Sequence, residues 1–245
     1  MNQSIPYSIY ALGENALAIN FGNKIEELIN QRVHAFAKHL KENRKVGWLD
    51  IIPAYSSVTI VYDVVEIRKH GASANAQVRK DLEVAMVTCN WEQKGTSRMI
   101  RVPVCYDIKM GLDLDRMTNE KGLTIDELVK LHTNRSYHVF MTGFLPGFPY
   151  MGTVDARLAT PRLQQPRTNV AKGSVGIAGE QTGVYPMESP GGWNVIGRTP
   201  VELFDVHRLN PVFLQPGDRV QFVSITIEEF ENFDLNKFNP VADES

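Results

Sequence analysis

The sequence predicts an α+β protein in which a ferredoxin-like α+β unit precedes an all-β barrel or sandwich. Over roughly residues 5 to 104 the patterns follow the order strand, helix, strand, strand, helix, strand, which is the order of a split βαβ unit. Beyond residue 142, short β patterns are separated by turns, and no long amphipathic helix lies among them, as in barrels and sandwiches. We therefore expect domains at 1–95 and 96–233, with a frayed tail at 234–245.

The first unit is predicted from the spacing of its apolar residues. Alternation of apolar and polar residues indicates strands, and a stripe with spacings of three and four indicates a helix. The expected elements are strands at 5–11 and 16–21, a helix between Asn23 and Gly47, strands at 48–53 and 57–62, a helix with Val78, Leu82, Ala85, Met86 and Cys89 inward, and a strand at 97–104.

The second half begins with a polar linking stretch, Tyr106 to Gly122. Thr124 and Glu127 have the spacing of a capping box, which predicts a short helix in TIDELVKLHT with Ile125, Leu128 and Val129 inward. The remaining expected elements are strands at 137–142, 173–178, 193–197, 200–204 and 219–225, and a helical turn or two within 227–233.

Composition excludes several classes of protein. A formal charge of −2 with no long basic run argues against a nucleic-acid or anionic-membrane surface. Cys89 and Cys105 lack metal or redox spacing, so we expect buried, reduced thiols. The histidines also lack ligand spacing, so we expect no metal site. Without a basic leader or a long apolar run at the N-terminus, we expect no membrane segment and a cytoplasmic location.

The stretch from Gly143 to Pro200 has an unusual composition, with 10 of the 18 glycines and 7 of the 13 prolines of the chain. Apolar and aromatic residues are interspersed among them, so the segment can fold despite its many helix and strand breakers. Glycine permits positive φ and proline fixes φ, which predicts rigid, sharply turned loops. Such loops commonly carry functional sites.

Four basic residues lie on these loops: Arg162, Arg167, Lys172 and Arg198. A guanidinium held by a rigid loop suits a carboxylate or a phosphate, because it donates two parallel charge-assisted bonds. The alternative is that the arginines bind backbone carbonyls or form surface ion pairs and hold the loops in place.

Other candidates have more than one interpretation. His132 could be a general base or could cap the helix that it ends. Phe144, Phe148, Tyr150 and Trp193 could be barrel core, the wall of a pocket or a protein-binding groove. No G-x-x-x-x-G-K-[ST] motif is present, so a nucleotide would not be held here by a Walker-type loop.

Several long motifs resemble one family: GFLPGFPYMG, LATPR, PRTNVAKGSVGIAGEQTGVYPMESPGGWNVIGRTP, LFD and PGDRVQF. The chain is similar over roughly residues 5 to 225 to the B subunit of 5-oxoprolinase, of the carboxyltransferase subdomain C and D type. This group contains the kinase inhibitor KipI and is related to allophanate hydrolase subunit 1. The resemblance implies an N-terminal α+β domain and a C-terminal cyclophilin-like β-barrel.

The resemblance also implies a site and a function. Its motif positions in this chain are His132, Gly143, Phe144, Pro146, Gly147, Phe148, Pro149, Arg162, Arg167, Gln181, Thr182, Ser189, Pro190, Gly191, Gly192, Trp193 and Arg198. Among these, His132 and Arg198 are the catalytic candidates, and the others include the substrate- or nucleotide-binding candidates. The segment Asp107 to Leu114 departs from the family's usual sequence, which puts any contribution of that segment to the site in doubt.

We therefore hypothesise that the chain is the B subunit of an ATP-dependent 5-oxoprolinase. Together with the A and C subunits it would open 5-oxo-L-proline to L-glutamate, and it would be inactive alone. Two alternatives from other classes stay open. One is a KipI-like inhibitor that binds a sensor histidine kinase through the aromatic and proline loops. The other is a component of an allophanate or urea-type amide hydrolase.

Overall fold

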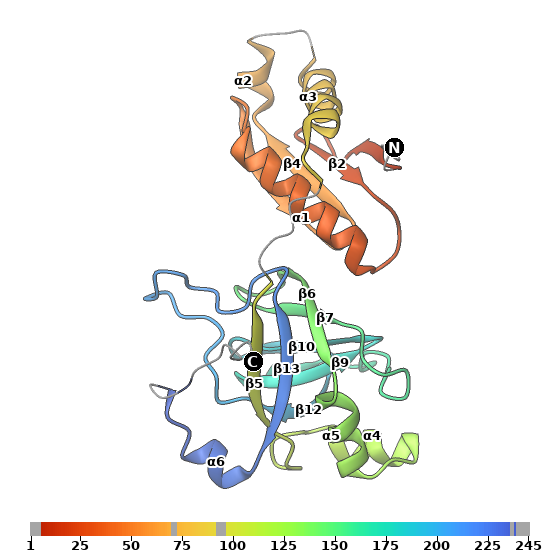
Figure 1. The fold of residues 1–245 in the computed structure, drawn as a ribbon, viewed down its shortest axis with the longest axis vertical. Coiled ribbons are helices and arrows are strands. Elements are labelled where there is room, and N and C mark those ends of the chain that lie inside the picture. Colours follow the sequence, from red (N-terminus) through yellow and green to blue (C-terminus); the bar gives the residue numbers. More distant parts are fainter. Residues whose placement is uncertain (1–5, 70–72, 92–96, 236–237, 239–245) are drawn as a thin grey trace. The chain divides into compact units, whose positions relative to one another are not determined.

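The computed structural model describes residues 6–69, 73–91, 97–235 and 238 (Figure 1). The chain forms two compact units, Met1–Thr96 and Ser97–Ser245, and each has its own hydrophobic core. None of the helices in the described part of the chain has the length and hydropathy that a bilayer-spanning segment requires.

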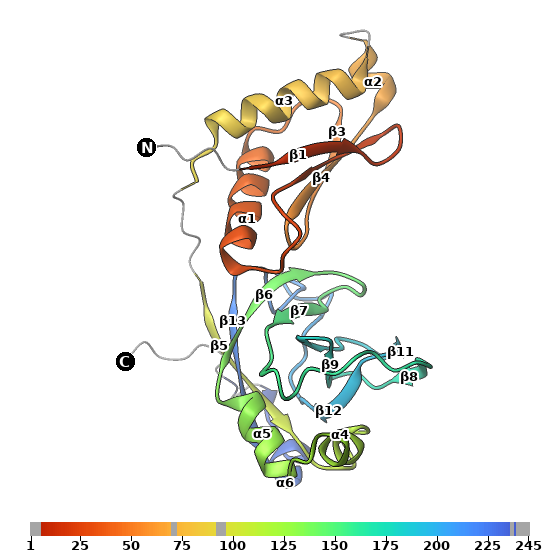
Figure 2. The same ribbon diagram turned by 90° about the vertical axis from the view of Figure 1, so that its right-hand side faces the viewer.

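The first unit is a four-stranded antiparallel sheet in the order β1-β2-β4-β3. Helix α1 packs on β3 and β4, and α3 packs on β2 (Figure 2). The later part of the predicted apolar stripe is buried on α1, with Val33, Phe36 and Leu40 facing the core, whereas Ile25 precedes the helix and Leu28 is exposed. The elements are β1 (Ser8–Ala11), β2 (Ala16–Asn20), α1 (Glu27–Glu42), β3 (Trp48–Pro53), β4 (Ser57–Tyr62), α2 (Val64–Arg68) and α3 (Ala74–Thr88).

Two expectations for the strand at 97–104 differed: the order of elements placed it last in the N-terminal α+β unit, whereas the expected domain boundary placed it in the barrel domain. In the structure β5 (Met99–Cys105) is a barrel strand of the second unit. In the N-terminal sheet, the edge beside β2 is formed by β1, and β5 takes no part in this sheet. The assignment of this unit to the ferredoxin-like class stays a prediction.

The second unit is a closed barrel with the strand order β10-β7-β6-β13-β5-β12-β9. Strand β13 lies parallel to β5 (Figure 1), and the other neighbouring strands are antiparallel. A two-stranded sheet of β8 and β11 accompanies it. The strands are β6 (Ser136–Thr142), β7 (Pro149–Gly152), β8 (Arg167–Val170), β9 (Ser174–Ala178), β10 (Gln181–Val184), β11 (Ser189–Gly191), β12 (Asn194–Arg198) and β13 (Arg219–Ile225).

The helices of this unit differ in part from expectation. The predicted capping box of α5 (Ile125–Thr133) is present, with Thr124 and Glu127 bound reciprocally. The stretch expected to be a polar linker contains α4 (Leu114–Lys121), which packs against α5 at one end of the barrel. The chain also has α6 (Ile227–Glu231) within the expected range.

Residues 200–204, expected to be a strand, form only an isolated bridge between Phe204 and Val212. Most of the predicted frayed tail, residues 236–237 and 239–245, lies outside the described residues.

Candidate functional site

An aromatic cluster forms one side of the barrel unit. It consists of Phe144, Phe148, Tyr150, Tyr185 and Trp193. Phe148 lies at its centre, with ring centroids 4.9 Å from Tyr150 and 5.3 Å from both Tyr185 and Trp193, all edge-to-face. Edge-to-face pairs place the positive ring edge against a negative face, so they stabilise the cluster beyond the burial of its area.

Glycines make room for these rings. A Cβ on Gly191 would lie 2.3 Å from the Tyr185 hydroxyl, and one on Gly183 would lie 2.9 Å from the Phe148 ring. The glycine-rich sequence of this region therefore serves close packing of aromatic rings against backbone as well as turn formation. Phe144 is the exception within the cluster, because it is 63% exposed and has a φ of 67°.

Arg162 is held over the cluster by its backbone neighbours. Nδ2 of Asn194 donates to the carbonyl of Pro161 at 2.9 Å, and the N–H of Leu163 donates to the carbonyl of Gly192 at 2.8 Å. These bonds fix the chain on both sides of Arg162, whose Cζ lies 6.0 Å from the Trp193 ring centroid. A guanidinium over a ring uses its face, which leaves its N–H edge available to a ligand.

Arg162 differs from the other loop cations in its partners. Within the described residues it is exposed and forms no hydrogen bond or ion pair. Burial raises the pKa of Tyr150 and of Tyr185, and the charge of Arg162 opposes both shifts. The cluster therefore presents neutral phenols beside one available cation.

Arg167 is bound within the protein. Its Nη1 and Nη2 donate to the two carboxylate oxygens of Asp113 at 2.8 and 2.9 Å. Asp113 is buried, and it also accepts from Arg116 at 3.3 Å and from the N–H of Val195 at 2.8 Å. Because the fork of Arg167 is occupied by this carboxylate, its geometry corresponds to the interpretation in which the arginine holds a loop in place.

Arg198 and Lys172 are also engaged. Nε of Arg198 donates to the Lys172 carbonyl at 2.7 Å, and its Cζ lies 5.9 Å from the Phe230 ring centroid. The ammonium of Lys172 forms an ion pair with Glu202. Arg198 keeps part of its donor capacity, but its partners are α6 and the Lys172 backbone rather than the aromatic cluster.

His132 lies in the barrel core, on α5, and is fully buried. Its Nδ1 is 2.7 Å from the Tyr106 hydroxyl and its Nε2 is 3.0 Å from Oγ1 of Thr182. Thr182 donates its only hydroxyl proton to the Gly176 carbonyl at 3.2 Å, so Nε2–H donates to Thr182 and Tyr106 donates to Nδ1. The imidazole is stacked on Phe222 with centroids 4.6 Å apart.

Burial lowers the pKa of His132 to about 3, and nearby Arg135 contributes to the same shift. The imidazole is therefore neutral near pH 7, with both nitrogens committed to internal partners. This arrangement joins two predicted site residues, His132 and Thr182, and connects α5 to β10. It suits a group that positions β10, and the expected role in proton transfer stays a prediction.

The other predicted residues occupy the surrounding backbone. Gly147 has a φ of 79° and lies against Leu203 and Phe204, while Pro149 begins β7. Gln181 begins β10, and Ser189 lies on β11. Phe144, Phe148, Arg162, Gly191, Gly192 and Trp193 come together at the aromatic cluster.

Four residues that support this region were absent from the sequence prediction: Tyr106, Asp113, Tyr185 and Asn194. Asp113 had a local signal, since it precedes Leu114 and Met117, whose spacing of three and closing Gly122 fit a short helix. The roles of Tyr106 and Asn194 depend on partners far away in the chain, and no local pattern indicates them.

Metal and thiol chemistry find no support in the described residues. No group of three or more His, Cys, Asp or Glu side chains in this part of the chain could hold a metal ion. Cys89 and Cys105 are free and buried, and burial raises the pKa of Cys89 to about 11. A thiol with such a high pKa is a weak nucleophile at neutral pH because little of it is thiolate.

The fold and the cluster define the chain as a mixed α/β protein whose barrel unit contains a largely buried aromatic cluster with Arg162 over its Trp193 ring. The sequence profile of the carboxyltransferase domain, subdomain C and D, matches residues 7–214. The chain belongs to this family, and within it to the group of 5-oxoprolinase B subunits.

Two relatives illustrate the similarity. The 5-oxoprolinase B subunit from Bacillus subtilis is 39% identical over 234 residues, covering 94% of this chain and 98% of the relative. The protein of the same name from Escherichia coli O157:H7 is 36% identical, covering 87% and 94%.

Solved structures agree on the fold. The protein TTHA0988 is 35% identical with a TM-score of 0.73; the match covers 86% of this chain but only 40% of that one. A conserved uncharacterized protein from Pyrococcus horikoshii is 38% identical with a TM-score of 0.53, covering 91% and 100%. The urea amidolyase of K. lactis, 19% identical, has a TM-score of 0.77 over 94% of this chain and 15% of its own. The closed seven-stranded barrel and this likeness confirm the expected cyclophilin-like barrel.

Proposed function

We propose that this chain is the B subunit of an ATP-dependent 5-oxoprolinase, in which it acts with the A and C subunits to open 5-oxo-L-proline to L-glutamate. Three relatives that carry the name of this subunit, at 33–39% identity, support the proposal. The observation that carries it is the placement of Arg162 over Trp193, with its position fixed on both sides and its N–H edge available.

Arg162 would bind the carboxylate of the substrate. 5-Oxoproline combines a carboxylate with a small, largely apolar ring, and the surface combines a guanidinium with a floor of aromatic rings. A bidentate bond from Arg162 fixes the plane of the carboxylate, and the partly buried ring of Tyr150, close enough to Arg162 to feel its charge, offers apolar contact to the lactam ring. The site would thus orient the lactam rather than cleave it alone.

The reaction needs more than this surface provides. A lactam is a poor electrophile because of amide resonance, and phosphorylation of its carbonyl oxygen would create an imidate that water can attack. The turns at Gly173 and Gly179 do not offer their amides to a phosphate, because Gly173 N–H donates to the Tyr185 carbonyl and Gly179 N–H to the Thr160 carbonyl. We therefore place ATP binding with the partner subunits, and assign no phosphoryl step to this chain.

The test is glutamate release that depends on 5-oxoproline and ATP. The chain is assayed alone, and then co-purified with the A and C subunits from the same source. We expect activity in the complete set and none in the chain alone. An assembled complex that releases no glutamate would contradict the proposal, and the same complex can then be tested on urea-derived amides, the alternative suggested by urea amidolyases at 23–26% identity.

Phe144 supports a second candidate function, that of an inhibitor of a sensor histidine kinase. Its ring is 63% exposed and its backbone has a φ of 67°, and an exposed aromatic ring on a turn can enter a pocket of a partner protein. The same ring could equally contact a partner subunit. A purified kinase and the chain are mixed and analysed for a stable complex and for lowered autophosphorylation. Complex formation that is lost in Phe144→Ser and kept in the exposed control Leu209→Ser would support the inhibitor, and no complex would leave the enzyme subunit as the function.

A further inference from the structure

The bond that fixes the backbone just before Arg162 depends on a residue of α4. Nδ2 of Asn194 donates to the carbonyl of Pro161 at 2.9 Å, and Oδ1 of the same amide accepts from Nη2 of Arg116 at 2.5 Å. Arg116 lies on the helix that the sequence did not predict, 78 positions before Asn194 in the chain. Two successive hydrogen bonds therefore connect α4 to the residue that precedes Arg162.

Arg116 determines which way the amide of Asn194 points. Asn194 is buried, and its Nδ2 donates to two carbonyls, those of Pro161 and Ile177, each at 2.9 Å. In the reversed orientation its oxygen would face these two carbonyls and its NH2 group would face the Arg116 guanidinium, so acceptors would meet acceptors and donors would meet donors. Because a buried polar group without a partner is costly, the cationic donor at Oδ1 stabilises the orientation that binds Pro161.

Two carboxylates hold the Arg116 guanidinium in place for this contact. Nη1 donates to both oxygens of Glu120, four residues further along α4, at 2.9 and 2.8 Å. Nη2, the nitrogen that binds Asn194, also donates to Oδ1 of the buried Asp113 at 3.3 Å. Side chains three and four residues apart meet on the surface of a helix. The two carboxylates therefore fix Arg116 on its own helix, and Asn194 is the partner through which it acts on the barrel.

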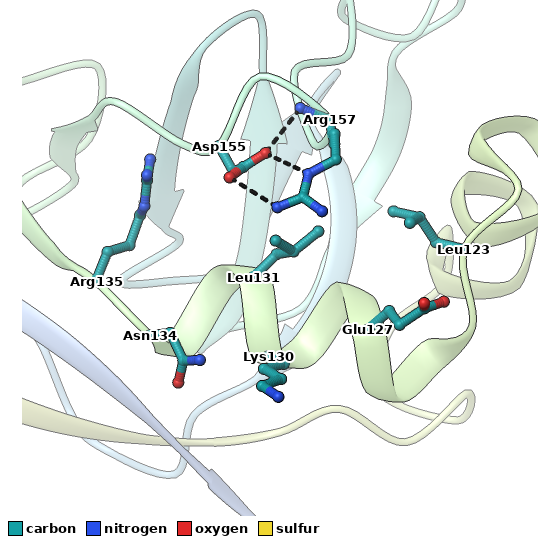
Figure 3. A pocket seen from close by; sticks show the side chains of 8 residues that line it. All are labelled: Leu123, Glu127, Lys130, Leu131, Asn134, Arg135, Asp155 and Arg157. Atoms are coloured by element: carbon teal, nitrogen blue, oxygen red, sulfur yellow. Dashed lines mark hydrogen bonds and ion pairs between the residues drawn. The ribbon is translucent and has the colours of Figure 1, made fainter.

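The first part of the same loop has supports of its own. Asp155 accepts from the N–H and Nε of Arg157 at 3.0 and 2.9 Å through one oxygen, and from Nη2 at 3.2 Å through the other (Figure 3). Farther along, the carbonyl of Ala159 accepts from Nζ of Lys121, the last residue of α4, at 2.8 Å. Helix α4 therefore binds the loop directly at this point and, two residues later, through Asn194. The bond made through Asn194 is the nearer of the two to the guanidinium proposed to bind substrate.

We propose that Arg116 is a positioning residue for the substrate carboxylate. Through Asn194 it fixes the backbone from which Arg162 extends, and Arg162 then binds the carboxylate. The inference rests on the proposed function, because it takes Arg162 as the substrate-binding residue. A planar guanidinium forms two parallel bonds with a carboxylate only within a narrow range of orientations, so a shift of its backbone weakens binding although Arg162 itself is intact.

The first test is made on the full chain and needs no partner subunit and no turnover. Arg116→Met keeps an unbranched stem and removes the guanidinium, and the control Glu120→Gln removes the charge of the ion pair but keeps an acceptor for Arg116. In NMR spectra, Arg116→Met should shift the amide signals of Arg162 and Leu163, and Glu120→Gln should leave them in place. Unchanged signals in Arg116→Met, or equal shifts in Glu120→Gln, would overturn the proposal. If Arg116→Met does not fold, Arg116→Lys keeps a charged donor without the planar fork and should shift the same signals less.

The second test is a double-mutant cycle in the assembled complex. Arg116→Met should raise KM for 5-oxoproline by about threefold to tenfold, the effect of one hydrogen bond, and change kcat by less than about twofold. In the Arg162→Ala background the same substitution should have no further effect, because the residue through which it acts is gone. An undiminished rise in KM in that background would overturn the proposal. An inactive wild-type complex would instead contradict the proposed function, and the NMR comparison would then decide by itself whether Arg116 positions Arg162.

Discussion

The buried carboxylate of Asp113 receives both arms of the Arg167 guanidinium, at 2.8 and 2.9 Å, across 54 residues of sequence. The same carboxylate accepts from Val195 N–H, next to Asn194, whose side chain holds the backbone beside Arg162. The ion pair of Arg167 with Asp113 thus stabilises the backbone that positions Arg162.

Asp113→Asn should destabilise the barrel. The amide cannot accept from all the donors that the carboxylate binds, and it leaves the Arg167 charge without its partner. Breaking a buried pair costs about 3–5 kcal/mol, and the 28% exposure of the Arg167 side chain reduces this to about 2–3 kcal/mol. Urea unfolding of the full chain measures the change. Asp115→Asn, on the exposed side of the same helix, is the control and should lie within about 0.5 kcal/mol of the wild type.

Arg162→Ala should lower kcat/KM of the assembled complex by about 10- to 100-fold, because a charge-assisted pair to the substrate carboxylate contributes about 1.5–3 kcal/mol. Arg162→Lys keeps the charge without the fork and should give an intermediate value. Urea unfolding should be unchanged, since the side chain is exposed. The control is Arg101→Ala, at an exposed position of β5. Full activity of the alanine variant would remove Arg162 from the site.

His132 should make the protein less stable in mild acid. Its pKa is about 3 in the folded state against 6.5 unfolded, so below pH 6.5 the unfolded chain binds a proton that the folded chain does not. The contribution of His132 to the free energy of unfolding is fully present above pH 6.5 and declines as the pH falls toward 3. Between pH 6.5 and 5 the loss is about 2 kcal/mol.

His132→Gln keeps one acceptor and one donor and does not titrate, so the stability difference between the two pH values should shrink by that amount. Equal differences in both proteins would contradict the burial of a neutral imidazole.

The same variant tests catalysis. Near-normal turnover with altered stability indicates a positioning residue, whereas a folded, inactive complex indicates proton transfer by His132.

Gly191→Ala should destabilise the aromatic cluster by about 1–3 kcal/mol, as overpacking does in other cores. The new methyl group would clash with the hydroxyl end of Tyr185, whose buried ring packs edge-to-face against Phe148. Near-UV circular dichroism and urea unfolding report the change. The neighbouring Gly192 is a close control, because its nearest contact would be an ordinary 3.5 Å. Equal losses of stability in Gly191→Ala and Gly192→Ala would contradict the close packing of Gly191 against Tyr185.

Local patterns predicted much of the fold. The strands expected at 48–53 and 57–62 have those bounds in the structure, and the Thr124 capping box begins α5 as expected. Strands β7, β8, β10 and β11 were not predicted because they are three or four residues long and contain proline, glycine or other turn residues. Helix α4 was missed because its eight residues are mostly polar. The strand expected at 200–204 was wrong because its apolar residues pack in an irregular loop.

By itself the sequence determined the periodic elements, the concentration of glycine and proline in the loops, and the motifs that place the chain in its family. These features depend on neighbours within a turn or two of the chain. Only the tertiary structure decided which sheet β5 joins and which arginines are already bound. Arg162 and Arg167 lie in similar Pro-Arg pairs. The N–H groups of Arg162 are available because the bonds that hold its loop are made by the backbone of Pro161 and Leu163. Those of Arg167 are occupied because Asp113, far away in sequence, meets its guanidinium in space.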